Sequence, residues 1–184
     1  MLQFSTGTRQ QLPPQLFEQM GHYRREVFIN KLGWELKTTH GMELDEFDGP
    51  DAVYVCSQDD EGNVNGVARL LPTTGPYLME KLFPQVWAGN VLPRDPQIWE
   101  LSRFAVVDVN ADSSFAHKYI ARHAPKLFQL AIESIKRHAA QQLITVSPIG
   151  IERLLRVHGF SAIRAGIPRN FEGAPIVALR IAIF

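Results

Sequence analysis

The chain has 184 residues, of which 45% are hydrophobic and 21% charged, with 19 Lys and Arg against 19 Asp and Glu. This composition is typical of a globular protein, and the length predicts a single domain over residues 1–184. There is no apolar run near the roughly 20 residues that span a bilayer, no signal peptide, and only one cysteine, Cys56. We therefore expect a cytoplasmic protein without membrane contacts, a disulfide framework or a cysteine-based metal site, with Cys56 in the core.

The zero net charge hides an uneven distribution along the chain. Residues 1–66 carry 5 Lys and Arg against 11 Asp and Glu, whereas residues 115–158 carry 7 against 2. A basic segment on a neutral protein argues against bulk nucleic-acid binding, but it is compatible with one acidic partner that docks locally.

The N-terminal half predicts one helix, an acidic loop and two strands. Residues 15–28 have apolar residues at helical spacing, and residues 36–50 are acidic and loop-like. Residues 52–57 and 64–71 read as strands joined by a Gly- and Asn-bearing turn. Residues 72–97 contain five prolines and two glycines, which favour a long irregular excursion.

The C-terminal half alternates strands and helices. We expect strands at 99–108, 143–147, 160–167 and 175–184, because these runs are rich in β-branched and apolar residues. Helices are expected at 126–141, opened or kinked by Pro125, and at 151–159, closed by Gly159; Asp112–Ser114 can cap the chain ahead of the first. The order of the elements predicts an α/β (α+β) fold, a mixed sheet with helices packed on it.

A few charged residues lie among apolar or aromatic neighbours, where an unpaired charge is costly. They include three arginines and three acids, which would balance if they met: Arg24, Arg69, Arg103, Asp45, Asp48 and Glu100. Arg24 and Phe28 are one helical turn apart and share a face. Other motifs are missing, since the sequence has no dinucleotide or phosphate-binding glycine loop and no HExxH, and its six histidines lack metal-ligand spacing.

The combined pattern resembles the N-acyl-homoserine lactone synthases of the LuxI type, which make bacterial quorum-sensing signals. The matching positions cover nearly the whole chain: Arg24, Phe28, Trp34, Asp45, Asp48, Arg69, Phe83 in KLFP, and Glu100 and Arg103 in WELSRFAV. The segment TVSPIGIERLLRVHGF is also similar to the C-terminal part of the family. The resemblance implies a fold related to the GNAT acyltransferases, a twisted mixed β-sheet between helices.

The resemblance also implies the reaction. The amine of S-adenosyl-L-methionine attacks the thioester of an acyl chain on acyl carrier protein, and the product then closes to a lactone and releases 5'-methylthioadenosine. S-adenosyl-L-methionine is then a substrate, and no cofactor or metal is expected. The basic segment 118–156 becomes the expected dock for the acidic carrier protein.

Roles for single residues follow from the same resemblance. Glu100 and Arg103 are the expected catalytic residues, with Glu100 as the general base that acts directly or through water. Asp45 and Asp48 suit the cationic groups of S-adenosyl-L-methionine or hold the arginines, and Arg24 suits its carboxylate. The same substrate is expected to contact Phe28, Trp34, Arg69, Phe83 and Phe104. The acyl chain is expected to lie against Phe104, Thr145, Ser147 and Leu155, and the family associates threonine at the position of Thr145 with 3-oxo chains.

The spacing of Glu100 and Arg103 leaves a geometric question. On a regular strand, residues three apart point to opposite faces. Either a β-bulge between them brings both to one face, which we favour, or Glu100 faces substrate while Arg103 braces Asp45 and Asp48 from the other side.

Two other function classes compete with the synthase. A GNAT-type N-acyltransferase using acyl-CoA should carry a glycine-containing pyrophosphate loop, but DVNADSSFAHKYIARH contains no glycine. A non-catalytic signal-binding domain would need no base and should tolerate Glu100→Gln. A DNA-binding regulator is not supported, because no basic recognition helix is evident.

Overall fold

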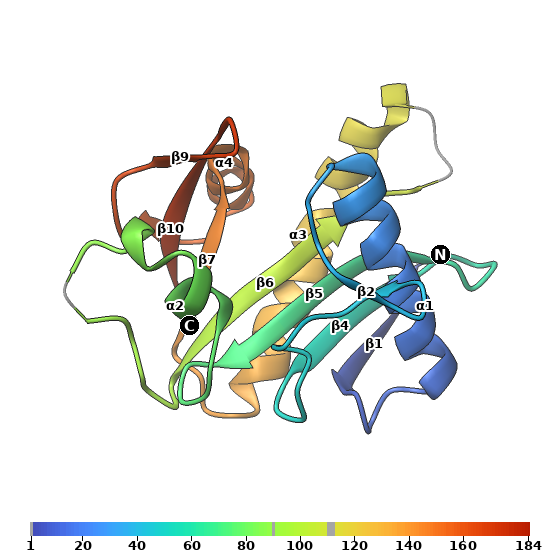
Figure 1. Cartoon of the computed structure of the whole chain (residues 1–184), viewed down its shortest axis with the longest axis horizontal. Helices are drawn as coiled ribbons and strands as arrows, with labels where there is room; N and C mark the ends of the chain where they lie inside the picture. The colour runs from blue at the N-terminus through green and yellow to red at the C-terminus, as the bar shows by residue number, and fades with distance from the viewer. Residues whose placement is uncertain (1, 90, 110–112) are drawn as a thin grey trace. The chain divides into compact units, whose positions relative to one another are not determined.

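The computed structural model describes residues 2–89, 91–109 and 113–184 (Figure 1). The chain forms two compact units. The first comprises residues 1–69 and 103–134, and the second comprises residues 70–102 and 135–184. Within the described ranges, no helix has both the length and the apolar character needed to cross a membrane.

The first unit is built on an antiparallel set of strands. β1 (Gln3–Thr8) pairs with β4 (Val53–Gln58), with Gln3 opposite Gln58 and Thr8 opposite Val53. β4 neighbours β5 (Val64–Pro72), whose residues up to Arg69 belong to this unit. The two strands predicted at 52–57 and 64–71 are confirmed. β1 escaped prediction because QFSTGT has a single large apolar residue and no apolar alternation.

Two long helices cover opposite faces of these strands (Figure 1). α1 (Pro14–Arg24) continues as a π-helical turn, η1 (Arg25–Lys31), and its Phe17 meets Tyr54 of β4 edge-on at 5.5 Å. On the other face, α3 (Ser113–Lys136) packs so close that a Cβ on Gly66 would lie 3.3 Å from Leu127 and 2.4 Å from Ser57 Oγ. A side chain at this position of β5 would therefore push the helix away.

The predicted bounds of α3 need correction. The helix starts at Ser113 and ends at Lys136, so Pro125 lies inside it rather than opening it. A proline in a helix interior is unfavourable in local terms, which is why the sequence suggested a start there. The predicted cap at Asp112–Ser114 lies outside the residues whose side chains the structure describes.

The core of the first unit holds the lone cysteine. Cys56 on β4 is completely buried, and burial raises the pKa of its thiol to about 12. The expectation that it is a small core residue is confirmed.

The second unit contains a mixed sheet. β6 (Ile98–Val106) runs parallel to β7 (Gln142–Pro148), with Ile98 opposite Gln142 and Leu101 opposite Thr145. β10 (Ala174–Ala182) pairs antiparallel with β7 and also with β8 (Ala162–Arg164) and β9 (Arg169–Phe171). The parallel pair requires a crossover, supplied by α3 between β6 and β7. The predicted mixed sheet is confirmed, although residues 160–167 form only the three-residue β8.

Helix α4 (Ile149–Val157) follows β7 directly, as predicted, and the chain turns at Gly159 with a φ of 81°. Leu155 on its inner face is 2% exposed. The amphipathic pattern of IERLLRV therefore buries one face on the sheet and leaves Arg153 and Arg156 exposed.

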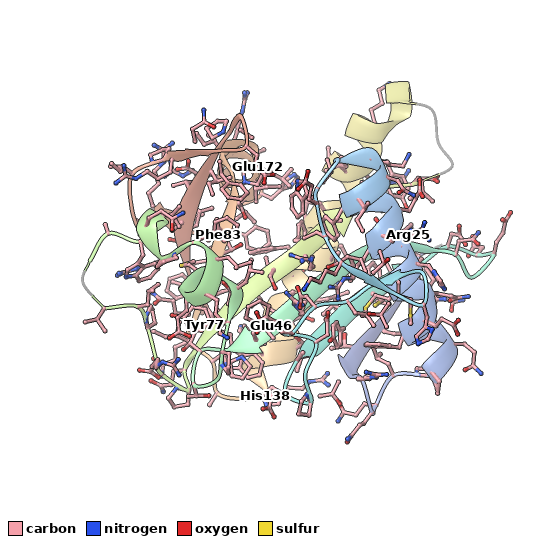
Figure 2. The ribbon with its side chains drawn as sticks, viewed as in Figure 1. Arg25, Glu46, Tyr77, Phe83, His138 and Glu172 are labelled. Atoms are coloured by element: carbon pink, nitrogen blue, oxygen red, sulfur yellow. The ribbon has the colours of Figure 1, made fainter. Side chains whose placement is uncertain are left out.

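The excursion 72–97 is more ordered than its composition predicts. It contains a short helix, α2 (Leu78–Leu82), and a 3₁₀ turn, η2 (Pro84–Val86). The N–H of Thr73 donates to Ile98 O at 3.1 Å, and the hydroxyl of Tyr77 donates to Pro93 O at 2.8 Å. Figure 2 labels Tyr77 and Phe83, which precede and follow α2. These hydrogen bonds join residues near the beginning of the excursion to residues near or just after its end.

Strand β6 is irregular where the sequence analysis expected it to be. Arg103 has a φ of 50°, in the left-handed region that residues with side chains adopt rarely. The prediction that the backbone between 99 and 105 departs from a regular strand is confirmed. A shared face for Glu100 and Arg103 stays a prediction.

Candidate functional site

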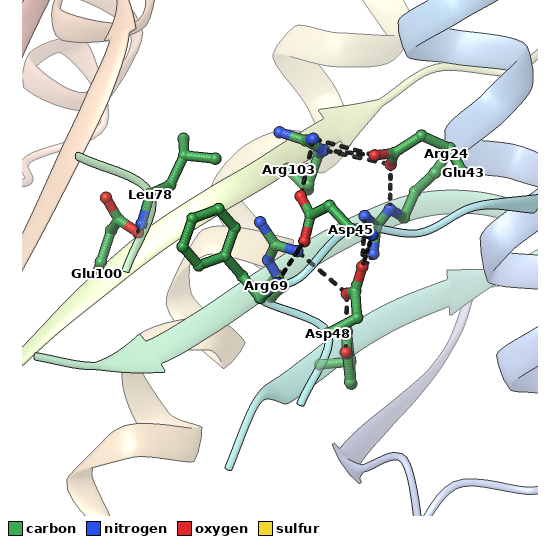
Figure 3. A network of polar contacts seen from close by, with 10 residues as sticks. Arg24, Glu43, Asp45, Asp48, Arg69, Leu78, Glu100 and Arg103 are labelled. Atoms are coloured by element: carbon green, nitrogen blue, oxygen red, sulfur yellow. Dashed lines mark hydrogen bonds and ion pairs between the residues drawn. The ribbon is translucent and has the colours of Figure 1, made fainter. Parts of the chain in front are cut away.

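The first unit contains a buried network of ion pairs, here called the ion cluster (Figure 3). It joins three arginines to three carboxylates: Arg24, Arg69, Arg103, Glu43, Asp45 and Asp48.

Arg24 enters the ion cluster from the last turn of α1. Its Nε donates to Glu43 Oε2 at 2.6 Å, and its two terminal nitrogens donate to the two oxygens of Asp48 at 2.7 and 3.0 Å. This fork-to-carboxylate geometry is the strong form of an arginine ion pair. The side chain is fully buried, so these contacts stand in for water.

The other two arginines come from the strands. Nη1 of Arg69 on β5 lies 2.5 Å from Asp45 Oδ1 and 3.1 Å from Asp48 Oδ1. Nη2 of Arg103 on β6 donates to Glu43 Oε1 at 3.0 Å and to Asp45 Oδ2 at 2.9 Å. Every carboxylate of the ion cluster therefore bridges two arginines.

The acids come from one short stretch, residues 43–48, here called the acidic loop. Glu43 ends β3 (Met42–Glu43), which pairs with β2 (Thr38–Thr39) in a small hairpin. Beyond it, the N–H of Asp45 donates to Asp48 Oδ2 at 2.8 Å, and the hydroxyl of Tyr54 donates to Asp48 Oδ1 at 2.9 Å. The carboxylates are thus held in place by their own backbone as well as by the arginines.

The charges of the ion cluster reinforce one another. Burial would raise the pKa of Glu43 and of Asp48, but the neighbouring arginines hold the pKa of both carboxyls below the ordinary range. Burial would likewise lower the pKa of Arg24, yet Asp48 and Glu43 raise it above its ordinary value. These groups are therefore ionised at neutral pH.

An aromatic stack adjoins the ion cluster. The rings of Phe28 and Trp34 are stacked at 5.0 Å with an interplanar angle of 18°, and the guanidinium of Arg103 lies 5.6 Å from the centre of the Phe28 ring. Phe28 is 2% exposed, whereas Trp34 is 36% exposed. A flat, partly exposed indole beside fixed charges suits a planar or cationic ligand.

In the second unit, Glu100 of β6 is fully buried and binds the start of α2. Its Oε2 accepts the N–H of Leu78 at 2.8 Å, and its Oε1 accepts the N–H of Met79 at 2.6 Å. Figure 3 shows the Glu100 side chain next to the backbone of Leu78.

The residues expected to contact the acyl chain are distributed over both units. On β7, Thr145 and Ser147 are buried on the same side of the strand, with their hydroxyls 3.1 Å apart, and Leu155 on α4 is buried in the same unit. Phe104 belongs to the first unit, where it meets Phe128 of α3 edge-on at 5.9 Å. Phe83, expected to contact S-adenosyl-L-methionine, packs edge-on against Phe171 at 5.0 Å in the second unit.

Comparison with known proteins identifies the family. A family model described as autoinducer synthase matches residues 10–183, which is almost the whole chain. The chain belongs to the autoinducer synthase family. Membership makes the protein an acyltransferase. Most of the charged and aromatic residues that carry the resemblance form the ion cluster and the aromatic stack.

Several relatives of this synthase are characterised. It is 45% identical over 169 residues to an acyl-homoserine-lactone synthase of Acinetobacter nosocomialis, covering 91% of this chain and 92% of that protein. Among solved structures it is similar to TofI in a ternary complex with an inhibitor and MTA, with a TM-score of 0.85, 37% identity, and coverage of 98% and 91% of the two chains. It is also similar to BjaI, a CoA-dependent acyl-homoserine lactone synthase with SAM and isopentyl-CoA, with a TM-score of 0.85, 27% identity, and coverage of 100% and 84%.

The fold extends beyond the family. An acyl-CoA N-acyltransferase from Pseudomonas aeruginosa has a TM-score of 0.64 to this synthase at 16% identity, covering 99% of this chain and 100% of that chain. The expected GNAT-like acyltransferase fold is confirmed.

Five of the six members of the ion cluster could be predicted from the sequence, and one could not. The three predicted arginines and two of the predicted acids do form ion pairs with one another: Arg24, Arg69, Arg103, Asp45 and Asp48. The third carboxylate of the ion cluster is Glu43, which is 1% exposed, and not the predicted Glu100. The sequence offers one signal, because Glu43 lies only two residues before Asp45 in the same acidic stretch.

Proposed function

We propose that this synthase makes an acyl-homoserine lactone from S-adenosyl-L-methionine and an acyl thioester. The amine nitrogen attacks the thioester carbonyl carbon, and the thiol leaves. A carboxylate oxygen of the acylated product then attacks the aminobutyryl carbon that is bonded to the sulfonium sulfur. The bond between this carbon and sulfur breaks, and 5'-methylthioadenosine leaves. The observation that supports this most is membership of the autoinducer synthase family, together with the similarity to BjaI, whose structure holds SAM and isopentyl-CoA.

Glu100 is proposed to take the proton that the ammonium group must lose before it attacks. Because the side chain is fully buried and both oxygens already accept backbone N–H groups, we propose transfer through a water molecule. Replacing Glu100 by Gln should lower kcat by about 10²- to 10⁴-fold, the usual contribution of a general base. Wild-type turnover in this variant would remove Glu100 from the role.

Trp34 and Phe28 are proposed to bind the adenine and sulfonium end of S-adenosyl-L-methionine. The exposed face of Trp34 supports this role, since it offers both stacking and cation–π attraction. Phe83, Phe104 and Arg69 are proposed as further contacts of the same substrate. Arg24 donates to Glu43 and Asp48 through all three of its nitrogens, so we assign it and Arg103 the task of holding the acidic loop in place.

The acyl chain is proposed to lie against Phe104, Thr145, Ser147 and Leu155. A hydroxyl at Thr145 can donate a hydrogen bond to a 3-oxo group, which supports a preference for 3-oxo chains. Replacing Thr145 by Val keeps the shape and removes the hydroxyl, so it should lower kcat/KM for a 3-oxo donor and leave an unsubstituted donor of equal length unaffected.

The donor is proposed to be acyl carrier protein, docking on the basic segment 118–156. The basic segment exposes the cationic side chains of Lys118, Arg122, Lys126, Arg153 and Arg156. Acyl-CoA is the second candidate, because BjaI is CoA-dependent. Both substrates are made inside the cell, so we also propose a cytoplasmic location.

The test compares the two donors directly. The protein is incubated with S-adenosyl-L-methionine and matched acyl chains on carrier protein or on CoA, and products are identified by mass. We expect an acyl-homoserine lactone and 5'-methylthioadenosine, formed with higher kcat/KM from the carrier protein. No lactone from any chain on either donor contradicts the proposed function.

A further inference from the structure

The carboxylate of Glu100 fits the start of α2 closely. Its two oxygens accept the N–H groups of two successive residues, Leu78 at 2.8 Å and Met79 at 2.6 Å. These are N–H groups of the first helical turn, which have no partner within a helix. A negative charge at this end of a helix is also favourable. The contact is therefore a cap supplied by a strand residue distant in sequence.

The cap is connected to Phe83 through one residue. Met79, whose N–H is bound by Glu100, accepts the N–H of Phe83 on its own carbonyl at 3.0 Å. Met79 is fully buried, so this turn has little room to shift. Phe83 in turn packs on Phe171 of β9 at 5.0 Å. A continuous set of contacts thus runs from Glu100 through α2 to the Phe83 ring.

Other side chains of the excursion hold its ends but leave the start of α2 to Glu100. Tyr77, the residue before the helix, donates its hydroxyl to Pro93 O, and Tyr77 offers no side-chain cap to α2. Arg94 pairs with Glu80 on the exposed side of the helix. The buried side of the first turn is bound by the Glu100 carboxylate.

We infer that Glu100 is a positioning residue for substrate binding: by capping α2 it holds Phe83 where S-adenosyl-L-methionine binds. The inference rests on the proposed function and adds to the base role a second role that does not depend on proton transfer. A residue that acts only as a general base would not need hydrogen bonds from the N–H groups of α2 to its carboxylate oxygens.

One of the two hydrogen bonds of the cap can be removed without changing Glu100. Leu78 is the first residue of α2, a position where proline is accommodated. Tyr77 before it is extended, with φ −139° and ψ 162°, which is the conformation that a residue before proline prefers. Leu78→Pro therefore deletes the N–H that Oε2 accepts, and Leu78→Ala is its control, because it truncates the same buried side chain and keeps the N–H.

The readout is the KM for S-adenosyl-L-methionine. We expect KM to be about tenfold higher in Leu78→Pro than in Leu78→Ala, which corresponds to about 1.4 kcal/mol. A loss of folded protein would lower the apparent kcat and leave KM unchanged, so it is not confused with this effect. Equal KM values in the two variants would overturn the inference.

A double-mutant cycle tests whether the effect passes through Phe83. Phe83→Ala should raise KM by itself, and adding Leu78→Pro to it should raise KM little further, because the ring to be positioned is gone. Fully additive effects would show that the cap acts elsewhere and would contradict the inference.

Failure of the proposed function is recognised separately. If the wild-type protein makes no lactone from any donor, the proposed function fails, but amide hydrogen exchange still reports the cap. The Phe83 N–H should exchange about tenfold faster in Leu78→Pro than in Leu78→Ala. If Leu78→Pro does not fold, the comparison is between Glu100→Gln and the wild type, and the Phe83 N–H should exchange about tenfold faster in Glu100→Gln. Unchanged protection in the folded variants would overturn the positioning role.

Discussion

Each arginine of the ion cluster is buried against two carboxylates, and each carboxylate against two arginines. An isolated buried charge would be very unfavourable, so the members depend on one another. Arg103 additionally holds a left-handed backbone conformation, which costs on the order of 1 kcal/mol or more for a residue with a side chain. Such strain persists where the surroundings fix it, and here the Glu43 and Asp45 contacts of the side chain do so.

Replacing Asp48 by Asn should destabilise the protein strongly. The change leaves Arg24 and Arg69 facing a neutral amide in a buried place, and breaking such a pair costs about 3–5 kcal/mol. The free energy of unfolding in urea measures the loss. Asp51→Asn is the matched control, since Asp51 is an exposed carboxylate three residues away, and it should change the value by no more than about 0.5 kcal/mol. Equal effects of the two changes would show that the ion cluster contributes nothing to stability.

Stability should also fall in acid through the same carboxyls. The pKa values of Glu43 and Asp48 are lower in the folded state than in the unfolded chain, where they are about 4. Their contribution is therefore fully present above about pH 5 and is lost as the pH falls below about 4 toward the folded pKa values. Thermal unfolding midpoints of the wild type and of Asp48→Asn, measured from pH 7 to pH 3, should converge in acid. Parallel curves would contradict this assignment.

For single residues, the sequence predicted which side chains are buried and charged better than it predicted the groups to which they bond. Residue types among apolar neighbours were enough to select five of the six members of the ion cluster. They were not enough to find Glu43, which looked like one more charge in an acidic loop. The hydrogen bonds of Glu100 to the N–H groups of Leu78 and Met79 could not be predicted either, because every residue except proline carries a backbone N–H whatever its side chain.

At the scale of elements, strands and helices with strong apolar patterns were predicted and short polar ones were not. The helix α1 followed from apolar periodicity, and the strands β4, β5, β6 and β7 followed from runs rich in β-branched and apolar residues. β1, α2 and β9 did not, since their residues pair or pack only through tertiary contacts. The π-helical turn η1, which carries Phe28, likewise has no local sequence signal.

The segment after α2 closely approaches the backbone of the residues that follow β8. A Cβ on Gly166 would lie 2.0 Å from Val86 O, and the N–H of Ala88 donates to Ala165 O at 2.6 Å. Gly166→Ala should force the two segments apart and destabilise the protein by about 1–3 kcal/mol. Gly150→Ala on α4, where no atom lies within 4 Å, should be neutral or stabilising by up to about 1 kcal/mol. Chemical denaturation compares the two, and a harmless Gly166→Ala would refute the close approach.

At the scale of the whole molecule, the basic segment 118–156 is the proposed docking surface for acyl carrier protein. Arg153→Glu reverses an exposed charge on α4 and should raise KM for an acyl carrier protein donor severalfold, more at low salt than at high salt. KM for S-adenosyl-L-methionine should stay the same. Lys31→Glu, an exposed cation outside the segment, is the control and should affect neither value. Equal effects of both reversals would reflect net charge rather than a docking surface.

The family and its fold were reached from the sequence because the charged and aromatic positions form a specific ordered set along the chain. What the residue pattern did not contain is the division of the chain into two compact units, with β5 and β6 running from one to the other. That division depends on contacts between residues far apart in sequence.

The proposed reaction requires that S-adenosyl-L-methionine supplies its aminobutyryl part, and not its methyl group, to the product. The most direct test uses S-adenosyl-L-methionine labelled with ¹³C in the aminobutyryl carbons and follows both products by mass. We expect all of the label in the acyl-homoserine lactone, with unlabelled 5'-methylthioadenosine formed in equal amount. Label that stays with the sulfur-containing product, or a methylated acceptor, would contradict it.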